Sequence, residues 1–170
     1  MDTYHPYHPV VSTIITLLKG GGYWFETWEH EPVTTSEEAA KVRHGYSLSQ
    51  GAKAIIVKSE KPHQDTNSHF VMLVLPGDAK IDSKKVKKSL GLGKFSFASS
   101  VDLAHVTNGV ESGGVPPWGS LFSLTVYVDG TLSQHEKIIF NAGDRRFSIA
   151  MKYRDYMTLV QPLIADIRVS

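Results

Sequence analysis

The chain has 170 residues, of which 41% are hydrophobic and 21% are charged, and its formal net charge is +1. This length suffices for one hydrophobic core and is short for two full-sized domains. The sequence contains no cysteine, which excludes disulfide bonds, cysteine-based zinc sites and a cysteine nucleophile. Because no run of about 20 apolar residues occurs and residues 1–9 lack the order of a secretion signal, we expect a cytoplasmic protein.

Helices and strands are expected in an irregular order along the chain. Apolar residues at helical spacing predict a first helix over Pro9–Lys19, which the glycines that follow end. Thr35, with Glu38 three residues later, predicts a capped second helix that reaches His44. Further helices are expected over 83–90, 101–107 (capped by Ser100) and 153–164 (with a break near Pro162), and strands over 23–29, 53–58, 70–75, 95–97, 121–128, 137–141 and 146–151.

The order of these elements predicts the fold class. Strands and helices do not alternate strictly, and hairpins are expected where Ile55 pairs with Val71 and where Val126 pairs with Ile139. We therefore expect an α+β fold with a mixed, mostly antiparallel sheet. The continuous apolar runs in 54–57 and 71–75 predict that helices cover both faces of part of this sheet.

Motifs of several enzyme classes are missing from the sequence. There is no Walker-type phosphate loop, no Gly-x-Gly-x-x-Gly after a strand and no Gly-x-Ser-x-Gly elbow. The eight histidines form no HxxxH or HxH pair within an expected helix or strand. We expect neither a metal nor another cofactor.

Three features remain as candidates for chemistry. Lys53 stands at the head of an apolar strand, where a lysine either reaches for solvent or directs its charge into a cleft. The loop Gly113–Gly119 (GGVPPWG) either presents bare backbone to a small polar ligand or forms a rigid turn. Lysines cluster at Lys80, Lys84, Lys85, Lys87, Lys88 and Lys94, where they either attract phosphates or form a solvated helix face.

Five segments occur together in a characteristic order. They are His30–Ala40 (HEPVTTSEEAA), Lys53–Val57, Pro76–Asp78 with the lysine-rich helix, Gly113–Pro117 followed by Gly119, and Asp129 with Asn141–Gly143. In this order they resemble the YbaK/prolyl-tRNA-synthetase-associated editing domains, which deacylate mischarged transfer RNA. The resemblance extends from about residue 23 to residue 160. It implies one domain with a barrel-like sheet over residues 23–170, on which a helix within residues 1–22 packs.

The resemblance also implies roles for single residues. The lysine at the position of Lys53 is needed for activity in the family, where its ammonium can bind the terminal phosphate or ribose and stabilise charge near the ester. Gly113 and Gly114 would hold the aminoacyl group through backbone atoms, and Pro117 would fix the course of the loop.

Two further positions carry an alternative interpretation. Asp129 resembles an acid that faces the pocket in the family, although an aspartate before a glycine also suits a turn. Thr35 would line the pocket, or its hydroxyl simply caps the helix.

The implied reaction is ester hydrolysis without a metal or a covalent enzyme intermediate, in which a positioned water and the adjacent ribose hydroxyl suffice. Lys84, Lys85, Lys87 and Lys88 would contact the acceptor end of the tRNA, and an aminoacyl-tRNA synthetase is a second expected partner. The edited amino acid (alanine, cysteine, or serine and threonine) stays open, because pocket volume decides it.

Two other functions stay open. The chain could be a non-catalytic tRNA- or synthetase-binding module of the same fold. It could also dock on a synthetase through exposed aromatics, namely Tyr4, Tyr7, Trp24 and Trp28. Lys53 together with an intact glycine-proline loop favours the enzyme.

Overall fold

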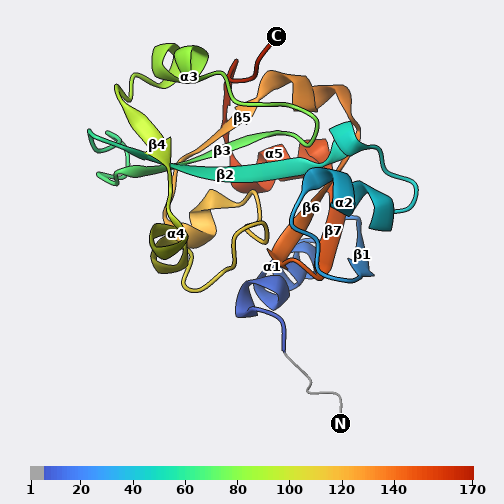
Figure 1. The fold of residues 1–170 in the computed structure, drawn as a ribbon. Coiled ribbons are helices and arrows are strands. Elements are labelled where there is room, and N and C mark those ends of the chain that lie inside the picture. The colour runs from blue at the N-terminus through green and yellow to red at the C-terminus, as the bar shows by residue number, and fades with distance from the viewer. Residues whose placement is uncertain (1–5) are drawn as a thin grey trace.

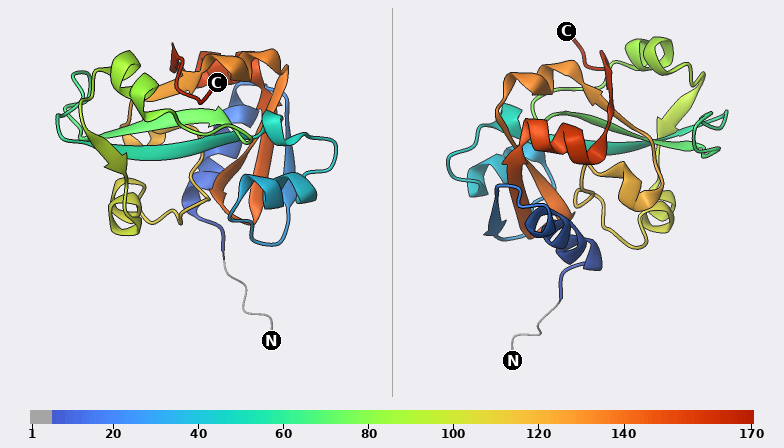
Figure 2. Two further views of the ribbon diagram at one scale, coloured as in Figure 1. Left: turned by 45° about the horizontal axis from the view of Figure 1, so that its top comes forward. Right: turned by 180° about the vertical axis from the view of Figure 1, so that it is seen from behind.

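A computed structural model describes residues 6–170, which form two β-sheets with helices around them (Figures 1 and 2). The larger sheet has the order β4-β2-β3-β5-β8, made of β2 (Ala52–Ser59), β3 (Phe70–Pro76), β4 (Phe95–Phe97), β5 (Val126–Asp129) and β8 (Leu163–Ala165). The smaller sheet has the order β1-β7-β6, made of β1 (Phe25–Glu29), β6 (Lys137–Asp144) and β7 (Phe147–Lys152). Only the β3–β5 and β5–β8 pairs are parallel among the described strands, which confirms a mixed, mostly antiparallel α+β fold.

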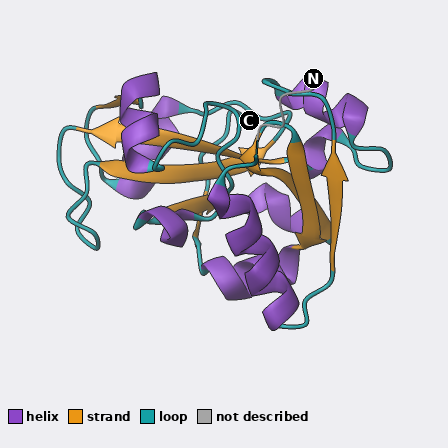
Figure 3. Ribbon diagram, turned by 90° about the horizontal axis from the view of Figure 1, so that it is seen from below, coloured by secondary structure: helices purple, strands orange, loops and turns teal. Residues whose placement is uncertain are grey.

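Five helices lie at the periphery of the strands (Figure 3). They are α1 (Pro9–Gly20), α2 (Ser36–Val42), α3 (Ser83–Leu90), α4 (Ser100–Val106) and α5 (Tyr153–Val160). All five begin within a residue of the expected position. The cap of α4 is Ser99 rather than Ser100, because the Ser99 hydroxyl accepts the N–H of Asp102. No helix of the described chain is long and apolar enough to cross a membrane.

The expected strand over 121–128 and its hairpin partner were wrong. Residues Gly119–Phe122 form a 3₁₀ helix, and β5 begins only at Val126. After β5, the Asp129 side chain accepts the N–H of Thr131 and starts another 3₁₀ helix, which carries the chain away from the larger sheet. Val126 therefore pairs with Met72 of β3, and Ile139 pairs with Ala150 of β7 in the smaller sheet.

The end of the chain also differs from the expected helix. The helix α5 ends at Val160 because Gln161 takes a left-handed conformation (φ 51°), and Pro162 cannot donate a helical hydrogen bond. The break near Pro162 is confirmed, but residues Leu163–Ala165 form β8 on the edge of the larger sheet.

The two sheets do not close into a barrel among the described residues. Their link is an isolated bridge between Gly51 and Ile139. The larger hydrophobic core lies between the sheets, and the buried side chains of Ile14 and Leu18 pack α1 into it.

Strand β2 separates this core from a smaller one. Ala52 and Ile56 belong to the larger core, whereas Val57 meets the buried Val86 of α3 in the smaller core. Helices therefore cover both faces of this part of the sheet, as expected, with α3 on the side opposite α1 and α4 (Figure 1). Because side chains alternate along a strand, Lys53 leaves β2 on the side of α3.

Candidate active site

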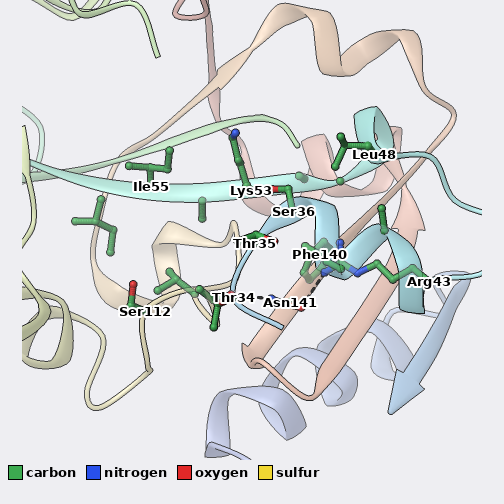
Figure 4. Close-up of a pocket in the computed structure, with 18 of the residues that line it drawn as sticks. Thr34, Thr35, Ser36, Arg43, Leu48, Lys53, Ile55, Ser112, Phe140 and Asn141 are labelled. Atoms are coloured by element: carbon green, nitrogen blue, oxygen red, sulfur yellow. Dashed lines mark hydrogen bonds between the residues drawn. The ribbon is translucent and has the colours of Figure 1, made fainter. Parts of the chain in front are cut away.

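A cavity of about 420 Å³ lies beside an uncovered part of the edge of β2 (Figure 4). Strand β4 pairs only with Val57–Ser59, and the bridge to β6 involves Gly51. Neither strand pairs with Ala54, which lines the cavity. The sheet edge is thus covered on both sides of Ala54 and open at that residue.

The open edge presents backbone polar groups to the cavity. The N–H of Ala98 donates to the carbonyl of Ile56 over 3.0 Å, so the polar groups of Ile56 point away from β3. In an antiparallel pair this direction alternates, so Ala54, two residues earlier, points the same way. The N–H and C=O of Ala54 are therefore available to a bound molecule.

The other walls of the cavity come from segments that are far apart in the sequence. They include Thr35, Ala39 and Arg43 from α2 and its cap, Phe140 and Asn141 from β6, Phe97 and Leu103 around α4, and Gly113 from the glycine-rich loop. Among the described residues, no group of three or more His, Asp or Glu side chains is arranged to hold a metal ion.

Lys53 lines the cavity with a half-buried side chain, but its ammonium is turned to one side. The Nζ atom donates to the carbonyl of Gly77 over 3.3 Å and to the carbonyl of Ala79. Figure 4 shows Lys53 on the opposite side of β2 from Thr35 and Phe140. Burial lowers the pKa of Lys53. Both hydrogen-bond acceptors are neutral carbonyls, and the nearby charges of Glu37 and Asp78 oppose the effect of burial on this pKa.

Gly113 lines the same cavity as Lys53, in a left-handed conformation (φ 87°) that favours glycine. Gly114 and Pro117 do not line it. The N–H of Gly114 donates to Glu111, and the carbonyl of Pro117 accepts the buried hydroxyl of Tyr156 over 2.7 Å. These two hydrogen bonds fix the loop through residues that do not line the cavity.

Thr35 meets both of its expected roles. It lines the cavity, and its hydroxyl accepts the N–H of Glu38 over 3.1 Å to cap α2. The reciprocal bond expected for a capping box falls one residue earlier, because the Glu38 carboxylate accepts the N–H of Thr34 instead of that of Thr35.

Asp129 does not face the cavity, which corrects its expected role. Its side chain is 1% exposed and accepts the N–H groups of Thr131 and Ile167 over 3.0 and 3.1 Å. Burial opposes ionisation, but a hydrogen bond from the Thr131 hydroxyl, these two backbone hydrogen bonds and the charge of Arg168 outweigh it and lower the pKa of Asp129. Its carboxylate fastens the chain after β5 to the C-terminal segment, as the turn interpretation predicts.

The lysine cluster does not line the cavity either. Lys84, Lys87 and Lys88 are exposed on α3, and Lys85 pairs with Asp166 over 3.0 Å. Lys80 is near enough to Lys53 for its charge to lower the pKa of that ammonium. The cluster therefore begins beside Lys53 and continues along α3 on the far face of β2.

Three of the aromatic side chains expected to dock on a partner make contacts within the chain instead. The hydroxyl of Tyr7 donates to Glu29 over 2.8 Å, the ammonium of Lys137 lies 4.2 Å from the ring centre of Trp24, and Trp28 contacts an edge of Tyr46. Tyr4 lies outside the described residues.

Sequence reasoning missed Arg43, the cation deepest in the cavity wall. Only 6% of it is exposed, and burial lowers its pKa to about 10, so it stays protonated at neutral pH. Its Nε donates to Ser148 Oγ over 2.9 Å and its Nη2 donates to Asn141 Oδ1 over 2.8 Å. Arg43 follows the buried Ala39 by four residues, so both lie on the same face of α2. A charged residue at this spacing from apolar helix positions was the signal in the sequence that could have identified Arg43.

Comparisons with known proteins show the family to which the chain belongs. The model of the aminoacyl-tRNA editing domain matches residues 30–159. The chain belongs to the aminoacyl-tRNA editing domain family. The resemblance of the five segments is thereby confirmed, and the cavity residues Thr35, Lys53, Gly113 and Asn141 all lie within the matched region.

Two curated members of this family and one solved structure show how far the similarity extends. The chain is 31% identical over 156 residues to the multifunctional Ser/Thr-tRNA deacylase ProXp-y of Escherichia coli K12, covering 91% of this chain and 90% of that protein. It is 28% identical to the prolyl-tRNA editing protein ProX of Acetoanaerobium sticklandii, covering 78% and 79%. A solved structure described as a candidate trans-editing enzyme for prolyl-tRNA synthetase superposes with a TM-score of 0.79 at 22% identity, covering 97% of this chain and 100% of that chain, which shows the same fold.

Proposed function

We propose that the chain hydrolyses the ester bond of mischarged aminoacyl-tRNA in translation quality control, and therefore acts in the cytoplasm. The observation that carries this proposal is the cavity in which Lys53, Gly113 and the open backbone of Ala54 meet. Two similar proteins, ProXp-y and ProX, are named as a tRNA deacylase and a prolyl-tRNA editing protein.

The cavity suits the aminoacyl end of a nucleic acid. The carbonyls of Gly113 and Ala54 can accept hydrogen bonds from an α-ammonium group, and the N–H of Ala54 can donate to an ester oxygen. The Gly113 carbonyl already accepts from Asn141, but it has a second lone pair. Small side chains, including Ala39 and Ala54, line the wall and leave room for an amino acid of the alanine, cysteine, serine or threonine type.

Lys53 would meet the last phosphate of the tRNA rather than the ester itself. Its ammonium lies on the side of β2 that carries Lys80 and α3, and its hydrogen-bond acceptors are neutral carbonyls, with Glu37 and Asp78 near enough to act on its charge. A phosphate would give it a stronger, charge-assisted partner. The acceptor end would then continue over the exposed Lys84, Lys87 and Lys88, while Lys85 is held by Asp166.

The reaction would need little from the protein beyond positioning. An aminoacyl ester is already activated, so a bound water and the neighbouring ribose hydroxyl can carry out hydrolysis once the cavity orients them. A synthetase that uses the same tRNA is the expected second partner.

A panel of transfer RNAs charged with alanine, cysteine, serine, threonine or proline tests the proposal. Wild type is expected to release at least one amino acid faster than the uncatalysed rate, and Lys53→Ala is expected to release it more slowly. If wild type binds charged tRNA but deacylates none of the five, the chain is a binding module and the enzymatic proposal fails.

A further inference from the structure

The buried guanidinium of Arg43 has no carboxylate partner among the described residues. Its partners are the hydroxyl of Ser148 and the amide oxygen of Asn141, both of them neutral. His30 also contacts Ser148, through its Nε2 at 2.7 Å from Oγ. A buried charge is costly unless it is paired. Arg43 therefore carries a positive charge that the described chain itself does not compensate.

One nitrogen of this guanidinium remains for the cavity. Nε and Nη2 are engaged, and Nη1 has no hydrogen bond to another described residue. Nη1 lies 3.7 Å from the point that a β-carbon would occupy on Gly51, another residue of the cavity wall. Figure 4 shows the Arg43 side chain reaching from α2 to Phe140 and Asn141 inside the cavity. Arg43 lines the cavity, and Nη1 is its one nitrogen without a hydrogen-bond partner among the described residues, so Nη1 is the group available to a bound molecule.

The neutral partners alone do not require an arginine. A neutral donor on α2 could satisfy the oxygens of Ser148 and Asn141 without the cost of a buried charge. A guanidinium is favoured where negative charge must be bound in a site of low dielectric constant. The charge of Arg43 therefore points to an anionic group in the occupied cavity.

Depth decides which anionic group this is. Lys53 is half-buried at the edge of β2, whereas Arg43 is 6% exposed in the wall. The aminoacyl group ends the nucleic acid, so it enters deepest, and the phosphates stay nearer the opening. The group that reaches Arg43 is then the ester, whose carbonyl oxygen becomes negative only during the reaction.

We propose that Arg43 Nη1 binds the ester carbonyl oxygen and stabilises the negative charge that develops on it, a role that rests on the proposed function. A water oxygen forms a bond to the carbonyl carbon, and the water gives a proton to the neighbouring ribose hydroxyl, which passes its own proton to the ester oxygen of the ribose. The bond between the carbonyl carbon and that ester oxygen then breaks, and the ribose oxygen leaves as a hydroxyl. The products are the free amino acid and a tRNA with a free 3′ end.

Two stable analogues of the terminal nucleoside test this role without turnover. In one, an amide replaces the ester. In the other, an anionic tetrahedral phosphonate replaces it. Neither analogue carries a 5′ phosphate, so a phosphate contact of Lys53 does not contribute. Wild type is expected to bind the phosphonate about 100-fold more tightly than the amide, as an enzyme binds a mimic of its transition state.

The variants Arg43→Met and Arg43→Lys identify the source of this preference. Arg43→Met, which keeps a long apolar stem, is expected to bind both analogues about equally and to lose about 100-fold or more in kcat with a smaller change in KM. Arg43→Lys retains a charge but cannot keep the Nε and Nη2 bonds while also reaching the ester, so it should recover only part of the preference. Lys41→Met, which removes an exposed cation from the same helix, is the matched control and should match wild type.

The outcomes separate this proposal from the proposed function. If wild type binds neither analogue and deacylates no tRNA, the proposed function fails. If wild type deacylates tRNA but binds both analogues equally, or if folded Arg43→Met retains the preference, the role of Arg43 is overturned. Nitrogen NMR of wild type covers the case in which the variants unfold. The phosphonate, but not the amide, should shift one buried guanidinium resonance, and an equal shift by both analogues would contradict the proposal.

Discussion

The side-chain amide of Asn141 donates from Nδ2 to the carbonyl of Gly113 over 2.6 Å. This bond joins β6 to the glycine-rich loop across the cavity wall. The other end of the same amide accepts from Arg43, so one side chain connects the buried cation to the loop that would hold the substrate.

Asn141→Asp is expected to displace this loop. A carboxylate cannot donate to the Gly113 carbonyl, and its charge would instead pair with the guanidinium of Arg43. We expect kcat/KM for the preferred aminoacyl-tRNA to fall about fivefold, the equivalent of one hydrogen bond of about 1 kcal/mol. Asn67→Asp in the β2–β3 loop is the control. Wild-type kinetics in Asn141→Asp would show that this bond does not position the loop.

Lys53→Ala and Lys58→Ala compare two lysines of one strand. Lys53 lines the cavity, whereas Lys58 stands at the far end of β2 and pairs with Asp102 over 3.6 Å. If Lys53 binds a phosphate, Lys53→Ala should raise KM and reduce the salt dependence of kcat/KM, while Lys58→Ala should do neither. Equal effects of the two substitutions would remove the special role of Lys53.

The exposed lysines of α3 are predicted to attract the acceptor end of the tRNA. Replacing Lys84, Lys87 and Lys88 by glutamate should weaken tRNA binding and reduce the slope of affinity against salt by about one for each phosphate that a lysine no longer neutralises. Replacing the exposed Lys19, Lys41 and Lys61 by glutamate changes the net charge equally and serves as the control. A loss of affinity that is the same in both triple variants would indicate only a general charge effect.

Asp129→Asn should change stability rather than catalysis. The pKa of Asp129 is lowered in the folded chain, so its ionised form contributes stability above the ordinary aspartate pKa, and this contribution is lost as the pH falls through the folded value. At pH 7 the variant should lose about 1–3 kcal/mol of unfolding free energy. The difference from wild type should shrink on acidification below about pH 4. Denaturant unfolding across this range measures the effect, and a difference that is independent of pH would contradict it.

Local signals explain why most of the secondary structure could be predicted. The helix α3 begins and ends where Asp82 and Gly91 place its caps, and both residues are adjacent to it in sequence. The pairing partners of β5 depend instead on the 3₁₀ helix that follows Asp129 and separates β5 from β6. The residue pattern within β5 does not predict this helix. The antiparallel β2–β3 hairpin was predictable, although Ile55 pairs with Leu73 rather than with Val71, whereas the parallel β3–β5 pair was not predictable.

The candidate site was predictable only in part, for a similar reason. Lys53 and Gly113 stand out by their neighbours in sequence, and the fold brings them to one cavity. The direction of the Lys53 ammonium depends on the carbonyls after β3, and the importance of Arg43 depends on what β6 and β7 place around it. The sequence around Asp129 is compatible with a pocket acid and strongly favours a turn, and only its hydrogen-bond partners decide between the two.

Unpaired strand backbone usually invites another polypeptide to add itself to a sheet, and proteins must guard against the aggregation that results. Around Ala54 the gap is short, because the pairing with β4 begins at Val57 and the bridge to β6 involves Gly51. An incoming strand would need several consecutive free positions to align, so this gap rejects a foreign strand while admitting a guest the size of an amino acid. The same geometry thus offers a binding surface and protects the protein from self-association along that edge.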